Sequence, residues 1–200
     1  MNIMEKKLIF ATGNKNKLIE IAQILDGIEI VSMKEAGVDI DIVEDGTTFE
    51  ENSLIKARAV HKQIGGLVLA DDSGLVVDAL NGEPGIYSSR YMGEDTSYHE
   101  KNANIIKRLE GLEEKDRTAR FVCAVAAVFP DGSEEVVTGV MEGYIGYEEQ
   151  GEHGFGYDPI FILPKYGVST AVISPEAKNE ESHRGKALRE IKKVLESRGY

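Results

Sequence analysis

The fold of this chain is decided by one stretch, Gly66-Leu67-Val68-Leu69-Ala70-Asp71-Asp72-Ser73-Gly74-Leu75-Val76-Val77. An apolar run follows a Gly-Gly break, stops at two carboxylates, and resumes after Gly74. This pattern predicts a buried strand, a tight reversal at Gly74 and a second strand. Because strand residues point alternately to opposite faces, we expect Asp71 and Asp72 to leave the sheet in different directions, one of them toward a cleft.

Two adjacent carboxylates at the end of a buried strand have two interpretations. They repel each other unless a divalent cation or a group of Lys and Arg neutralises them, which indicates a functional site. The alternative is an Asp-rich turn that caps a hairpin through side-chain hydrogen bonds, the commoner use of Asp-Asp-Ser-Gly. This stretch alone leaves both interpretations open.

Length, charge and cysteine content narrow the class of protein. With 200 residues and 42% hydrophobic residues, the chain can bury a core without disulfides or structural zinc. The net charge of -12 argues against a broad nucleic-acid surface, so any phosphate site must be local. The apolar run at 8–11 is too short for a signal peptide and no stretch approaches a membrane span, so we expect a cytoplasmic protein. Cys123 lies in an apolar run, which predicts a buried small side chain in a reducing compartment.

The N-terminal half predicts alternating strands and helices. Strands are expected at 8–11 and 28–33, and a helix follows the turn Thr12-Gly13-Asn14. Thr12 or Asn14 can cap this helix, and the free amides of its first turn would form an anion site that Lys17 reinforces; a plain N-cap is the alternative. A second helix is predicted at 49–64, where Thr48 and Glu51 have the spacing of a capping box.

The C-terminal half predicts a mixed sheet and further helices. Residues 119–129 and 135–145 are predicted to form a β-hairpin around Pro130-Asp131-Gly132. A hairpin joins antiparallel strands, so the sheet cannot be entirely parallel. Helices are predicted at 96–109, after Ser174-Pro175, and from Ser182 onward. His183 and Arg184 would stand at the positive end of the last helix, where basic residues have no evident structural role.

Phe155 lies between glycines in Gly154-Phe155-Gly156-Tyr157-Asp158, a geometry suited to stacking a nucleobase. A glycine-rich turn with a core Phe is the alternative. Together with the carboxylates, lysines and helix terminus described above, this segment completes what a nucleoside triphosphate enzyme needs. The P-loop pattern and the Rossmann glycine fingerprint are both absent from the sequence.

The sequence resembles the noncanonical purine nucleoside triphosphate pyrophosphatases, also called inosine triphosphate pyrophosphatases. The resemblance rests on six strings in order between Ala11 and Leu188: ATGN..K, TFEEN..IKA, ADDSGL, PGIYS.RY, FGYDPIF and SHRGKAL. It implies an α/β fold over residues 1–200, a single two-lobed domain with a long mixed central β-sheet flanked by helices and an active-site cleft between the lobes. It also implies a homodimer that hydrolyses ITP, dITP or XTP to the monophosphate and pyrophosphate with Mg²⁺.

The resemblance implies roles for particular residues. Asp72 would be the proton acceptor and, with Glu44, would hold the metal. The acidic loop has Glu44-Asp45-Gly46 where relatives often carry two glutamates before Thr-Gly, so Asp45 is the alternative ligand. The triphosphate would be bound by Thr12, Gly13, Asn14, Lys15, Asn16, Lys17, Lys56 and Lys178, with Ser73 contacting substrate, and the base by Phe155, Gly156, Tyr157, Asp158, His183 and Arg184.

Two other classes stay open at this point. A non-catalytic nucleotide sensor would use the same phosphate and base contacts without needing Asp72. The septum-inhibitor-like pyrophosphatases, which prefer modified pyrimidines, share the fold but are not expected to carry the SHR and FGYD strings together.

Overall fold

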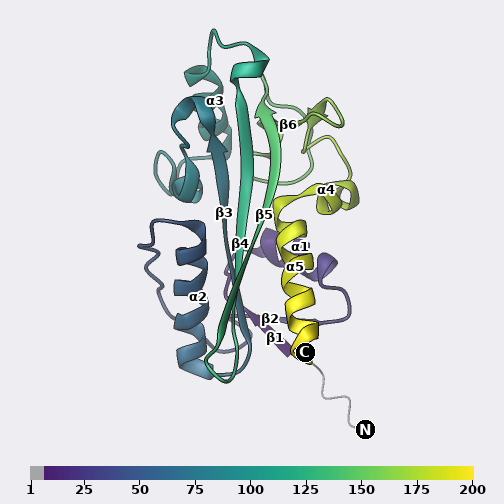
Figure 1. Ribbon diagram of the computed structural model, residues 1–200. Coiled ribbons are helices and arrows are strands. Elements are labelled where there is room, and N and C mark those ends of the chain that lie inside the picture. Colours follow the sequence, from purple (N-terminus) through teal and green to yellow (C-terminus); the bar gives the residue numbers. More distant parts are fainter. Residues whose placement is uncertain (1–6) are drawn as a thin grey trace. The chain divides into compact units, whose positions relative to one another are not determined.

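The computed structural model describes residues 7–200 (Figure 1). Within this range seven strands form one sheet in the order β2-β1-β3-β4-β5-β6-β7. Strand β1 is parallel to β2 and β3, whereas β6 is antiparallel to β5 and β7, so the predicted mixed sheet of an α/β protein is confirmed. The strands are β1 (Lys7–Phe10), β2 (Glu29–Ser32), β3 (Val68–Val77), β4 (Thr118–Val128), β5 (Glu134–Ile145), β6 (Phe161–Leu163) and β7 (Val168–Ser169).

The helices match the predicted order closely. They are α1 (Lys15–Ile24), α2 (Phe49–Ile64), α3 (Tyr98–Arg108), α4 (Pro175–Glu181) and α5 (His183–Ser197), with 3₁₀ turns at η1 (Asp78–Leu80), η2 (Gly85–Arg90), η3 (Glu114–Asp116) and η4 (Asp158–Ile160). None of the helices between residues 7 and 200 combines the length and apolar composition that a bilayer crossing requires.

The chain divides into two compact units. Unit 1 comprises Met1–Asp72, Cys123–Gly139 and Arg184–Tyr200, and unit 2 comprises Ser73–Val122 and Val140–His183. The boundary along the chain falls inside β3, β4 and β5 and after the first residue of α5. That the units form one domain over 1–200 with a cleft between two lobes stays a prediction, and residues 1–6 lie outside the described part.

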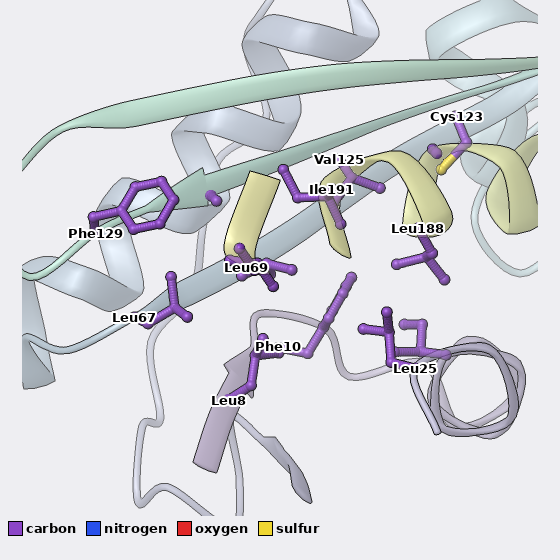
Figure 2. Packing of buried hydrophobic residues seen from close by; sticks show 14 residues of the cluster. Leu8, Phe10, Leu25, Leu67, Leu69, Cys123, Val125, Phe129, Leu188 and Ile191 are labelled. Atoms are coloured by element: carbon purple, nitrogen blue, oxygen red, sulfur yellow. The ribbon is translucent and has the colours of Figure 1, made fainter. Parts of the chain in front are cut away.

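In unit 1 the sheet is covered on both faces because its strand residues alternate. Leu69 of β3 belongs to a core with Phe10 and the α5 residue Ile191, which Figure 2 shows from close by. The next residue, Ala70, belongs to a separate core with Val60 of α2. Figure 1 accordingly shows α2 on one side of the strands and α5 on the other. Burial of both faces explains the nearly unbroken apolar run of β3.

Unit 2 has a core of its own. Its members come from the second half of β3, from α3, and from β4, β5 and β6, with Phe121, Met141 and Phe161 among the largest. Arg117 is buried beside this core and donates to the carbonyls of Leu109, Ile145 and Gly146 at 2.7 Å each. These bonds satisfy a charged side chain that would otherwise be costly to bury.

The central strand differs from the prediction. The reversal predicted at Gly74 is wrong, because β3 continues without interruption from Val68 to Val77. Asp71 and Asp72 therefore lie inside a strand and do not end it. Each carboxylate faces a cationic side chain, which removes the repulsion that made a break the natural expectation.

The predicted N-caps of α1 and α2 are present, but one capping residue has a different hydrogen-bond partner from the one expected. Asn14 caps α1, its side chain accepting from the backbone of Asn16 and Lys17 at 3.0 and 3.3 Å. Thr48 caps α2, but the carboxylate of Glu51 accepts from Thr47 and so the predicted capping box is only half formed. A full capping box is found instead at the start of α3.

Candidate active site

Asp71 and Asp72 leave β3 on opposite faces, as predicted. Asp71 Oδ2 lies 3.0 Å from Nζ of Lys17 on α1 and 3.3 Å from Nε of Arg184 on α5. Asp72 Oδ1 lies 3.8 Å from Nζ of Lys56 on α2. Two neighbouring carboxylates are thus held by cations on different helices of unit 1.

The first group, which we call the Asp71 cluster, consists of Lys17, Glu20, Asp71 and Arg184. Arg184 forms ion pairs with both Glu20 and Asp71, so the cluster contains two cations and two anions. The Asp71 side chain is fully buried, and its Oδ1 has no hydrogen-bond partner in the described part of the chain. Burial raises the pKa of Asp71, but the charges on Lys17, Arg184 and Lys56 outweigh it and hold that pKa well below its usual range. Asp71 is therefore held as an anion at neutral pH.

The second group, the Asp72 cluster, consists of Glu44, Asn52, Lys56 and Asp72. Lys56 Nζ lies 2.9 Å from Glu44 Oε2 and so stands between the two carboxylates. Burial raises the pKa of Asp72, and the charges on Lys56 and Lys17 offset only part of that rise. A carboxylate with a raised pKa is a better proton acceptor than an ordinary one.

The Asp72 cluster fits a magnesium ion. Mg²⁺ is usually bound through one or two carboxylates, with water and substrate phosphates completing its octahedron. Glu44 and Asp72 face the same ammonium group and supply such a pair. Asp45 is exposed, which favours Glu44 over Asp45 as the ligand. Among residues 7–200 no group of three or more His, Cys, Asp or Glu side chains could hold a metal by itself.

The turn before α1 is open to solvent. Gly13, Asn14, Lys15 and Asn16 are exposed, and the Thr12 hydroxyl accepts from the Asn14 amide at 3.2 Å. Asn14 caps the amides of Asn16 and Lys17, as in the plain N-cap given as the alternative, and the Lys17 ammonium faces Asp71, so an anion site at this turn stays a prediction. A side chain at Gly13 would meet no atom within 4 Å, so glycine is not required there by packing.

The Phe155–Asp158 segment of unit 2 is organised by the buried Asp158. Its Oδ2 accepts from the Phe155 amide at 2.8 Å and from Nζ of Lys178 at 2.7 Å, and its Oδ1 accepts from the Thr170 hydroxyl at 3.0 Å. The Lys178 ammonium also lies 5.1 Å from the centre of the Phe155 ring. Lys178, predicted as a phosphate ligand, is thus grouped with the predicted base-binding residues.

Tyr157 and His183 of unit 2 are held by aromatic contacts. Tyr157 packs edge-on against Tyr98, and its hydroxyl donates to the Ser88 carbonyl at 2.7 Å. The His183 ring stacks on Phe121 with 4.8 Å between centroids. Gly156 has a φ of 68°, which explains the glycine at that position. A base-binding role for this segment stays a prediction.

Arg184 has a structural partner that the sequence did not suggest. We expected no structural role for basic residues at the start of the last helix, and this is wrong for Arg184, which pairs with Glu20 and Asp71. Glu20 is a member of the Asp71 cluster that was not expected from the sequence, and Asp71 had been given no role of its own. A signal was available for Glu20, which stands three residues after Lys17 and so on the same helical face.

This chain is similar to known proteins over nearly its whole length. The model of the Ham1 family matches residues 8–194. The dITP/XTP pyrophosphatase of Bacillus subtilis is 44% identical over 197 residues, covering 98% of this chain and 100% of that protein. The dITP/XTP pyrophosphatase of Caldanaerobacter subterraneus is 46% identical, covering 94% and 96%.

Solved structures show the same fold. The Staphylococcus aureus Ham1 protein superposes with a TM-score of 0.87 at 39% identity, covering 96% of this chain and all of the other. A HAM1 protein from Coxiella burnetii gives a TM-score of 0.86 at 40% identity, covering 96% and 98%. With a family model, full-length relatives and solved structures in agreement, this chain belongs to the Ham1 family.

Proposed function

We propose that this protein hydrolyses noncanonical purine nucleoside triphosphates, namely ITP, dITP and XTP, to the monophosphate and pyrophosphate. Support comes from the relatives named dITP/XTP pyrophosphatase. The observation that carries the proposal is the Asp72 cluster, where a carboxylate of raised pKa stands beside a half-buried lysine and a second carboxylate. This arrangement suits attack of water on a phosphate rather than simple nucleotide binding.

Each of the residues already described has a separate role in the proposed reaction. Asp72 accepts the proton of the attacking water, and Lys17 and Lys56 offset the charge that grows on the departing pyrophosphate. Glu44 and Asp72 would hold Mg²⁺, which when bound neutralises phosphate charge. The remaining phosphate contacts are assigned to 12–16 and Ser73, and base contacts to 155–158, His183 and Arg184. Lys178 is assigned to the substrate from its place beside Phe155.

A substrate panel tests the proposal. Purified protein with Mg²⁺ is supplied with ITP, dITP, XTP, ATP, GTP and modified pyrimidine triphosphates, and phosphate and pyrophosphate are measured separately. We expect pyrophosphate from the first three. Release of phosphate, or preference for modified pyrimidines, would overturn the proposed reaction or substrate class, and absence of turnover with tight ITP binding would indicate a sensor.

The variant Asp72→Asn is nearly isosteric but cannot act as a carboxylate base. We expect turnover to fall by about 10²–10⁴-fold, with an unchanged unfolding transition. Asp45→Asn is the matched control, because this acid is exposed and belongs to the same unit. Near-normal turnover of Asp72→Asn would remove Asp72 from the chemistry, and a large loss in Asp45→Asn would move the metal site to Asp45.

We also propose a homodimer located in the cytoplasm, as the resemblance implies. Light scattering coupled to size exclusion should give twice the 22.0 kDa mass of one chain. A monomer mass at micromolar concentration would contradict the proposed dimer and would leave the proposed reaction unaffected.

A further inference from the structure

Asn52 is a fully buried polar side chain on α2, four residues before Lys56. Its Oδ1 accepts from the backbone amide of Gly46 at 2.9 Å. Its Nδ2 is buried and has no acceptor within hydrogen-bond distance in the described part of the chain. A buried donor without a partner is costly, so an amide at this position needs a reason beyond packing.

The nearest reason is Asp72. Asn52 lies one helical turn before Lys56, so the two side chains share a face of α2, and Lys56 Nζ lies 3.8 Å from Asp72 Oδ1. The buried amide thus lies on the helix face that meets the strand carrying Asp72.

Gly46 ties Asn52 to the acidic loop. A Cβ atom at Gly46 would lie 2.7 Å from Asn52 Oδ1 and 2.8 Å from Glu51 Cβ, closer than real contacts allow. The loop thus approaches α2 so closely that only glycine fits. Glu44 stands two residues earlier, so the Asn52–Gly46 contact also fixes the loop that carries this second carboxylate.

We propose that Asn52 is a positioning residue that holds Asp72 and the Glu44 loop in the relative placement required to bind Mg²⁺. Its Oδ1 holds the loop, and its buried Nδ2 belongs to the helix face that carries Lys56 next to Asp72. Partners of this kind around a metal site typically affect affinity or activity by about 10–100-fold when removed. The inference rests on the proposed function, because it assumes that Glu44 and Asp72 are the ligands.

The test replaces Asn52 by Leu, which has similar volume but neither polar atom. Two quantities are measured: the Mg²⁺ concentration that gives half-maximal ITP turnover, and Mn²⁺ binding by electron paramagnetic resonance in the presence of α,β-methylene-ITP. We expect Asn52→Leu to raise both midpoints by about tenfold or more and to lower kcat. Ser53→Ala is the matched control, since Ser53 is the next buried polar residue on α2 and its hydroxyl donates to the Glu50 carbonyl at 2.8 Å. It should leave both midpoints within twofold of the parent.

Gly46→Ala provides the second variant, because it disturbs the same contact from the loop side and should shift both midpoints in the same direction. The proposal is overturned if folded Asn52→Leu or Gly46→Ala protein keeps both midpoints within twofold of the parent. If Asp72→Asn retains normal turnover, the role proposed for Asp72 is wrong, and the inference about Asn52 fails together with the proposed function. If Asp72→Asn is inactive while Asn52→Leu binds metal normally, this inference alone fails.

Discussion

At the scale of single residues, Asp71 and Asp72 show how environment separates two identical side chains. Strand alternation sends Asp71 into a buried cluster with Lys17 and Arg184, where its pKa is held below the usual range. Asp72, on the other face, has a raised pKa because burial outweighs the charges near it. The first is suited to organising cations, and the second to accepting a proton.

We expect Asp71→Asn to lower the free energy of unfolding by about 3–5 kcal/mol, because it leaves buried cations short of a counter-charge. The folded pKa of Asp71 is depressed, so its contribution is present above the unfolded pKa and is lost as pH falls through the folded one. The gap between parent and variant, measured by urea unfolding, should therefore be widest near neutral pH and shrink only in strong acid.

Glu135→Gln is the control for Asp71→Asn. Glu135 pairs with Arg198 at 2.6 Å, also in unit 1, but this ion pair is partly exposed. Such pairs contribute little, so the control should unfold like the parent. Equal unfolding of Asp71→Asn and parent would show that the Asp71 cluster does not stabilise the fold.

Arg184 and Lys56 are expected to differ in what they recognise. Hypoxanthine and xanthine carry an oxygen at C6 where adenine carries an amino group, and Arg184 can only donate. Arg184→Ala should reduce the preference for ITP over ATP by about 1–3 kcal/mol, expressed as the ratio of the two kcat/KM values. Because the variant also loses the ion pairs of Arg184, kcat/KM is measured well below the melting temperature of the variant. Lys56→Ala should weaken both substrates alike. If Lys56→Ala changes the ratio and Arg184→Ala does not, the two roles are reversed.

At the scale of elements, strand β4 carries a thiol that the fold keeps unreactive. Burial, with a smaller effect from the nearby Asp71, raises the pKa of Cys123 to about 12. The thiolate is the reactive form, so at pH 8 the folded protein should react with a thiol reagent only as fast as it opens. Labelling that is fast in native buffer and unchanged by mild denaturant would contradict this.

Cys123→Ser should damage stability more than catalysis. The substitution buries a hydroxyl in a cluster of apolar side chains that includes Leu188 and Ile191, at a cost of about 1–3 kcal/mol (Figure 2). Thermal unfolding and ITP turnover, measured on the same preparation, decide the matter. Loss of turnover with an unchanged melting temperature would make the thiol functional.

Elements defined by local patterns were predictable from the sequence. Helix α2 was predicted at 49–64 and is found at those residues, because apolar periodicity and the Thr48 cap agree. The unbroken β3 was not, since its two carboxylates are stabilised by Lys17, Lys56 and Arg184 from distant parts of the chain. The site could be predicted only to the same extent. The sequence indicated which residue types belong to it, but the contacts of each lysine with a particular acid depend on the fold.

At the scale of the whole molecule, the positive charges are unevenly distributed. The net charge is -12, yet the buried or half-buried cations Lys17, Lys56 and Arg184 gather around the two acids of β3. Glu20 and Glu44 add two more acids, so these clusters carry no net positive charge, and a small polyanion would be held there by individual ammonium contacts. This explains how a phosphate substrate is compatible with the overall composition.

Substrate binding should then be visible as stability of the whole chain, without any chemistry. Asp72→Asn keeps the lysines and the base-binding segment but turns over slowly, so ITP can be added at equilibrium. A ligand that binds only the folded state at 100 times its Kd adds about 2.7 kcal/mol to the free energy of unfolding, which for this size raises the melting temperature by roughly 5–11 °C. We expect ITP with Mg²⁺ to produce this shift and ATP at the same concentration to produce a clearly smaller one, because its amino group leaves donors of the base site unpaired. Equal shifts from ITP and ATP would place the discrimination in the chemical step instead of in binding, and no shift from either would mean that the variant has lost the triphosphate site itself.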